Sequence, residues 1–162
     1  MFASLRNKAL PLVALCLAPG MGVCATTCTL AAGNVAFGGY DVFSPASLDS
    51  SGALVVTCSR AGGPPNATVS VAIGPSTSSG SIVNRRMQMP GGADFLGYNL
   101  FRDASRTSVW GNTAGVDTFV QTITVPNNGS VQISATIFGR IPAGQDVRMG
   151  IYSDTVVVTV AP

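Results

Sequence analysis

The feature that most limits how this chain can fold is a two-residue alternation of apolar side chains in several short segments. The segments with this pattern or with β-branched apolar runs are 53–58, 68–73, 118–125, 130–138 and 152–160. Turn-forming Gly, Pro and Asn residues separate them, and no segment shows a convincing helical period. The sequence therefore predicts antiparallel β-sheets closed into a sandwich or barrel.

One turn signal also predicts a strand pairing. Asn128-Gly129 follows the segment 118–125, and this dipeptide tolerates the positive φ angles of a tight hairpin turn. The segment 130–138 comes next, with Val131, Ile133, Ala135 and Ile137 on one face. We expect 118–125 and 130–138 to pair with each other.

The last apolar segment, 152–160, has an unprotected edge. Tyr152, Val156, Val158 and Val160 share one face, and the segment carries no Lys, no Pro and no bulge signal. Proteins usually protect a long, flat, apolar edge strand. The pattern leaves two interpretations open: a strand supplied by another polypeptide pairs with this edge, or the segment is a central strand of a complete sheet.

The beginning of the chain has the pattern of a secretory signal peptide. Arg6 and Lys8 precede the apolar run 9–17, and small residues follow up to Ala25. We predict cleavage after Ala25, so that 1–25 takes no part in the fold and 26–162 forms one domain. The apolar run is too short to cross a bilayer, which needs about 20 residues. We therefore expect export without membrane insertion of the mature chain.

Charge and composition exclude several functions. Cleavage removes two of the nine basic residues, Arg6 and Lys8, so the remaining seven arginines balance the seven aspartates. A neutral surface offers no footprint for nucleic acid or anionic lipid. The chain has no histidine, which excludes Ser-His-Asp and Cys-His catalysis and His-ligated zinc. We expect no enzymatic activity, no metal and no cofactor.

Two cysteines remain after cleavage, Cys28 and Cys58. An even pair in an exported chain predicts one disulfide, formed in an oxidising compartment.

Two polar clusters have more than one interpretation. Asp103, Arg106 and Trp110 could form a sugar-binding patch, but an ion pair beneath a core tryptophan is the commoner arrangement. Arg85-Arg86 could attract anions, although two charges in a neutral domain usually mark a solvated turn.

Four blocks of sequence resemble the spore coat protein U domain family, which includes subunits of archaic chaperone–usher pili of the Csu type. The first block runs from Cys28-Thr29-Leu30 through Val35-Ala36-Phe37-Gly38-Gly39-Tyr40 to Val55-Val56-Thr57-Cys58, and the second is Arg85-Arg86-Met87. The third block is Leu96-Gly97-Tyr98-Asn99-Leu100-Phe101-Arg102-Asp103, followed by Trp110-Gly111-Asn112. The fourth block is Phe138-Gly139-Arg140-Ile141-Pro142-Ala143-Gly144-Gln145, followed by Gly150-Ile151-Tyr152-Ser153-Asp154-Thr155. Each block is weak alone, and together they span nearly all of 28–160.

The resemblance implies an incomplete immunoglobulin-like antiparallel β-sandwich that lacks its last strand and is completed by a donor strand. A periplasmic pilus chaperone lends this strand, and an outer-membrane usher exchanges it for the N-terminal extension of a neighbouring pilin subunit. Carried onto this chain, the acceptor groove is lined by Leu30 and Phe37 from the first strand and by Tyr152, Val156, Val158 and Val160 from the last. Cys28 and Cys58 match the paired cysteines of the family.

One departure bears on the position in a fibre. Only Thr26 and Thr27 lie between the predicted cleavage site and Cys28, so the mature chain has no donor extension. We expect a terminal or tip-type subunit of a secreted or cell-surface fimbrium, exported through the periplasm, with an adhesive or biofilm role. The alternative is a stand-alone secreted coat or carbohydrate-binding protein with a self-completed sandwich. A groove filled by the chain's own backbone would contradict the first interpretation.

Overall fold

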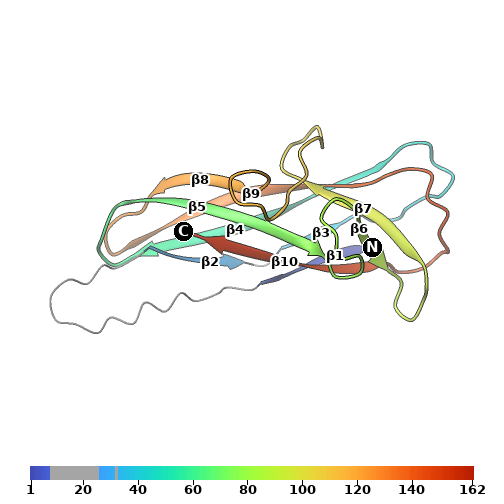
Figure 1. The fold of residues 1–162 in the computed structure, drawn as a ribbon, viewed down its shortest axis with the longest axis horizontal. Helices are drawn as coiled ribbons and strands as arrows, with labels where there is room; N and C mark the ends of the chain where they lie inside the picture. The colour runs from blue at the N-terminus through green and yellow to red at the C-terminus, as the bar shows by residue number, and fades with distance from the viewer. Residues whose placement is uncertain (8–25, 32) are drawn as a thin grey trace.

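The computed structural model describes residues 1–7, 26–31 and 33–162, and side chains are described for all of these except residues 5–7. The described residues form ten β-strands and no helix (Figure 1). The strands are β1 (Phe2–Asn7), β2 (Thr27–Ala31), β3 (Asn34–Ala36), β4 (Leu48–Arg60), β5 (Asn66–Ser76), β6 (Arg85–Gln88), β7 (Phe95–Phe101), β8 (Phe119–Thr124), β9 (Gly129–Ile141) and β10 (Ser153–Ala161). The predicted signal-peptide core and its cleavage site lie outside the described residues.

The strands form two layers that join at one corner. One layer has the order β2-β4-β9-β7, and its centre is the long antiparallel ladder between β4 and β9. In the other layer β8 pairs with β5, β5 with β10, β10 with β1, and β1 with β3. Strand β7 pairs with both β9 and β6, and β6 meets β10, so the sheet curls from one layer into the other. The predicted all-β sandwich is confirmed.

The core lies between these layers and follows the alternation in the sequence. Val69, Val71 and Ile73 of β5 are fully buried, and Ile133 and Ile137 of β9 are buried on the facing layer. Trp110 is the largest fully buried side chain, and its Nε1 donates a hydrogen bond to the carbonyl oxygen of Val71 at 2.9 Å. The apolar faces expected from the period of two are therefore the faces that pack.

The predicted hairpin between 118–125 and 130–138 is wrong. The turn forms, with Asn128 at φ 54° and a bond of 3.1 Å from the amide of Gly129 to the carbonyl of Pro126. The chain nevertheless changes layer there, because β8 pairs with β5 whereas β9 pairs with β4 and β7. The connection 61–65 makes the same crossing, and the amide of Val125 bonds to Pro65 of that connection at 2.8 Å.

Candidate strand-acceptor groove

Strand β1 lies between the last strand, β10, and the short strand β3. It runs parallel to β10, with register from Phe2 opposite Ser153 to Asn7 opposite Val158. On its other side it runs antiparallel to β3, with Phe2 opposite Ala36. We call the space that β1 occupies between β10 and β3 the acceptor groove. In Figure 1 the blue β1 lies beside the red β10.

This arrangement corrects the expectation that residues 1–25 take no part in the fold. In the uncut chain Phe2–Asn7 is a strand of the sheet, and the seam that we expected to be open is closed by the chain's own backbone. An open groove is therefore contradicted for the uncut chain, and it stays a prediction only for the chain without residues 1–25. The physical reason is that the edges of β10 and β3 expose unpaired amides and carbonyls beside an apolar strip, and such an edge pairs with an available strand. Removal of the leader stays a prediction.

The predicted lining residues divide into two groups. Phe37, Tyr152, Val156 and Val158 are buried, and they lie on or next to the strands that flank β1. Val160 is half-buried and lies opposite Val71 of β5, beyond the last pair between β1 and β10. Leu30 is buried on β2, where it lies opposite Val56 in the other layer.

Two lining residues were missed from the sequence. Val35 is fully buried on β3 and lies opposite Ala3 of β1. Asp154 is 5% exposed on β10 and lies opposite Ala3 on the other side. The alternation contained both, because Val35 shares its parity with Phe37 and Asp154 shares its parity with Tyr152 and Val156. Asp154 was not predicted as a lining residue because aspartate side chains are rarely buried.

Asp154 pairs with a buried tyrosine. The Tyr98 hydroxyl donates a hydrogen bond of 2.6 Å to Oδ2 of Asp154, and the ring of Tyr98 meets that of Phe37 edge to face at 5.9 Å between centroids. Burial, followed by the nearby charge of Asp154, raises the pKa of Tyr98 far above its usual value. The phenol therefore stays protonated and acts as the hydrogen-bond donor. The other oxygen of Asp154, Oδ1, is buried without a hydrogen-bond partner.

Comparison with known proteins fits this fold. A model of the Spore Coat Protein U domain family matches residues 20–159. The chain belongs to the Spore Coat Protein U domain family. It is also similar to Protein U of Myxococcus xanthus, with 31% identity over 147 residues, which cover 86% of this chain and 77% of that protein.

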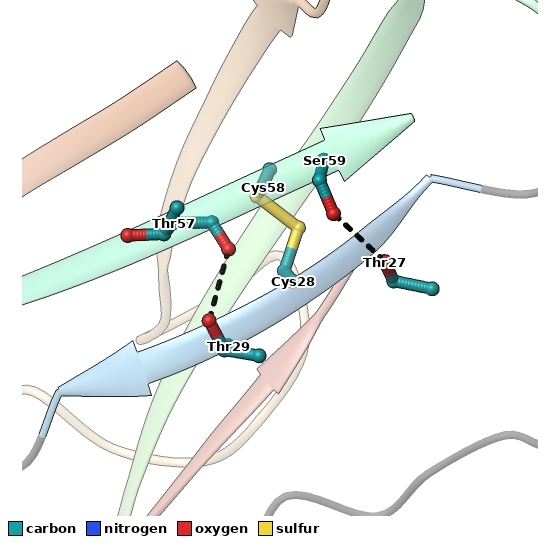
Figure 2. Close-up of a disulfide and its surroundings, with 6 residues drawn as sticks. All are labelled: Thr27, Cys28, Thr29, Thr57, Cys58 and Ser59. Atoms are coloured by element: carbon teal, nitrogen blue, oxygen red, sulfur yellow. Dashed lines mark hydrogen bonds between the residues drawn. A yellow bond between two sulfur atoms is a disulfide. The ribbon is translucent and has the colours of Figure 1, made fainter. Parts of the chain in front are cut away.

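The predicted disulfide of this Spore Coat Protein U domain is present. Cys28 of β2 and Cys58 of β4 are directly opposite in the antiparallel ladder, with Cα atoms 4.0 Å apart. Figure 2 shows hydroxyl-containing neighbours on both sides of the bond, with Thr27 Oγ1 3.2 Å from Ser59 Oγ and Thr29 Oγ1 donating to the carbonyl of Thr57 at 3.3 Å. The disulfide fixes β2, which would be the start of the mature chain, to the central ladder.

The interpretation of Arg85 as part of a solvated turn is wrong. Arg85 lies on β6 and is fully buried. Its guanidinium donates to the carbonyl oxygens of Ile73, Gly74 and Trp110 and, at 2.7 Å, to Oδ1 of Asn99. Burial lowers its pKa to about 10, so it is still a cation at neutral pH. Arg85 thus joins β5, β6, β7 and the loop that carries Trp110.

The cluster around Trp110 does not form the patch considered for sugars. The indole is fully buried, so it offers no stacking face, and Arg106 pairs with Asp49 at 3.3 Å instead of with Asp103. Asp103 accepts hydrogen bonds from the amides of Thr107 and Ser108 and from the hydroxyl of Ser105. These bonds hold the pKa of Asp103 well below its usual range. The expected ion pair between Asp103 and Arg106 is therefore wrong, because Asp103 caps its own turn.

Two further searches cover only the part of the chain that the structure describes. No group of three or more His, Cys, Asp or Glu side chains lies close enough together there to hold a metal ion. No helix there is long and apolar enough to cross a membrane.

Proposed function

We propose that this chain is a non-catalytic structural subunit of an extracellular fibre or coat, assembled by donor-strand complementation after loss of its leader. The observation that carries the proposal is β1. The strand that completes the sandwich comes from Phe2–Asn7, which the sequence assigns to a cleaved signal peptide. Cleavage after Ala25 takes this strand away and opens the acceptor groove.

An open groove is costly to the folded chain. Val35, Tyr152, Val156 and Val158 are fully buried while β1 is present and would lose cover on one side. Complete exposure of an aliphatic or aromatic side chain costs roughly 1.5–3 kcal/mol. Even partial exposure of four such residues is a large fraction of the stability of a domain, about 5–15 kcal/mol. The mature chain therefore needs a strand from another polypeptide.

The resemblance to pilus subunits suggests which polypeptides supply the strand. A periplasmic chaperone would lend it first, and a neighbouring subunit would supply it in the fibre after exchange at an outer-membrane usher. With only Thr26 and Thr27 before Cys28, the mature chain would accept a strand without giving one. We therefore place it at an end of the fibre, as a terminal or tip-type subunit.

A second candidate is favoured by the same strand. If the leader is retained, β1 completes the sandwich within one chain, as in this structure. The product would be a self-sufficient coat protein, a role that the family description suggests.

The deciding experiment is export of the chain to the periplasm with and without a cognate periplasmic pilus chaperone, followed by mass spectrometry of the N-terminus. The proposal expects Thr26 as the first residue, a low yield alone and a large gain in yield with the chaperone. Abundant stable monomer that begins at Met1 would establish the second candidate. Abundant stable monomer that begins at Thr26 would overturn strand complementation.

A further inference from the structure

The side chain of Asp154 borders the strand that fills the acceptor groove. Asp154 is the second residue of β10, is 5% exposed, and lies opposite Ala3 of β1 in the parallel register. Ala3 lies in turn opposite Val35 of β3, and both are fully buried. Paired residues of neighbouring strands point to the same face of a sheet. Val35, Ala3 and Asp154 therefore form one inward-facing row, with the inserted strand in the middle.

The carboxylate in this row is only half satisfied. Oδ2 accepts the hydrogen bond of 2.6 Å from the Tyr98 hydroxyl, but Oδ1 is inaccessible to solvent and has no partner. The methyl side chain of Ala3 has no polar hydrogen and cannot donate a hydrogen bond to this oxygen. The nearby cation, Arg85, directs its bonds to Ile73, Gly74, Trp110 and Asn99 and gives none to Asp154. Buried polar atoms without a partner are rare in folded proteins and destabilise them.

We propose that Asp154 is a specificity determinant of the acceptor groove, and that it favours a complementing strand with a hydroxyl-bearing residue, serine or threonine, at the position that Ala3 occupies here. This inference rests on the proposed function. A hydroxyl on the Cβ atom at this position would donate to Oδ1, and a serine adds only one oxygen atom to the space that Ala3 fills. A strand with alanine or valine there leaves the oxygen unpaired.

Strand β1 is not the ideal occupant of the acceptor groove. It covers the apolar residues of the groove but leaves Oδ1 of Asp154 buried without a hydrogen bond. A partner strand with serine or threonine in register would cover the same residues and satisfy this oxygen as well. The groove would therefore discriminate between strands of similar hydrophobicity by a single polar position.

The test uses the uncut chain, produced without export in a cytosol that allows disulfides to form, so that β1 stays in place. Ala3→Thr and Ala3→Val have nearly the same shape, and they differ in one hydroxyl. The measured quantity is the equilibrium constant for urea unfolding. We expect the Thr variant to favour the folded state about tenfold or more over the Val variant, because the hydrogen bond is to a charged acceptor. Ala36→Thr and Ala36→Val, on the exposed face of β3, form the control pair and should differ little.

A second comparison of Thr and Val at residue 3 uses a chain without the Asp154 carboxylate, which is the proposed hydrogen-bond acceptor. In an Asp154→Leu background the order should reverse, with Val at least as stable as Thr at residue 3. If the Asp154→Leu variant does not fold, the comparison of Ala3→Thr with Ala3→Val in the chain that keeps Asp154 still tests the proposed role of Asp154. A Val variant as stable as the Thr variant there overturns the role of Asp154 and leaves strand complementation intact, provided that both substitutions alter stability. If neither substitution alters stability relative to Ala3, residue 3 does not fill the groove and this inference fails, whereas acceptance of a strand from another polypeptide is not contradicted.

Discussion

The amide of Phe37 donates a hydrogen bond to the carbonyl oxygen of Met1 at 3.2 Å, which joins the first residue of the chain to the end of β3. On the opposite edge the amide of Phe2 donates to the carbonyl of Tyr152 at 3.3 Å, just before β10. Strand β1 is thus hydrogen-bonded to both of its neighbours at its start. The folded state of the uncut chain should depend on it as much as on a strand of the domain body.

The first prediction places a charge on the buried face of β1. Ala3→Asp in the uncut chain buries a second carboxylate beside Asp154, so the free energy of unfolding should fall by about 3 kcal/mol or more. Ser4→Asp is the matched control, because Ser4 is exposed on the other face of the same strand, and it should change stability by less than about 0.5 kcal/mol. Urea denaturation measures both. Equal effects of the two substitutions would mean that β1 does not occupy the groove.

The second prediction concerns the buried guanidinium of Arg85. Arg85→Met removes the guanidinium hydrogen bonds to three buried carbonyl oxygens and to Oδ1 of Asn99, and the free energy of unfolding should fall by about 3–5 kcal/mol. Arg86→Met on the same strand is the control. Arg86 is exposed and only packs over the ring of Phe95 at 5.8 Å, so its loss should cost about 1 kcal/mol or less. A chain that tolerates both substitutions equally would contradict the assigned role.

The contrast between Arg85 and Arg86 shows where prediction from sequence reaches its limit. Alternation identified the buried faces of β5, β9 and β10, because burial of apolar side chains is a local signal with a fixed period. The guanidinium of Arg85 is buried because acceptors from β5, β7 and the Trp110 loop converge on it, and this convergence exists only in three dimensions. The pairing of β8 with β5 instead of β9 has the same cause: a turn motif shows that the chain bends but does not show which layer it enters.

The strands that flank β1 show a related limit. The parity of residues 152–158 put Tyr152, Val156 and Val158 on one face, and all three are buried in the structure, whereas their role in accepting a foreign strand stays a prediction. The pairing of Phe2–Asn7 with β10 and β3 was not predicted, because this short segment of mixed polar and apolar residues, in the predicted signal peptide, carries no strand signal of its own. It pairs because the edges of β10 and β3 supply its hydrogen bonds.

The third prediction removes the disulfide. Cys28→Ser together with Cys58→Ser opens a covalent loop with a sequence separation of 30 residues, and the free energy of unfolding should fall by about 3–4 kcal/mol in the chain-entropy view. The same loss should follow when the unaltered protein is unfolded in the presence of a reductant. The double serine variant is the control for that experiment, since reductant should leave its unfolding midpoint unchanged. A reductant-sensitive double variant would point to another cause.

The last prediction tests the pair of Tyr98 and Asp154. Tyr98→Phe removes the hydrogen bond that the Tyr98 hydroxyl donates to the Asp154 carboxylate, so stability at pH 7 should fall by about 1–3 kcal/mol. The pH dependence should change as well. The pKa of Tyr98 is raised in the folded state, so the folded chain retains a proton that the unfolded chain loses above about pH 10. This contribution to stability is complete below pH 10 and declines as the pH rises further.

Arg85 contributes the opposite slope in that range. Its pKa is lowered to about 10 in the folded state, so the unfolded chain binds more protons above pH 10 and stability rises with pH from this group. The comparison of unaltered protein with Tyr98→Phe cancels the arginine contribution to first order and isolates the tyrosine. Between pH 9 and about pH 11 the unaltered protein should lose its advantage over the Phe variant progressively. A constant difference in urea midpoint across this range would mean that Tyr98 ionises as readily in the folded state as in the unfolded chain.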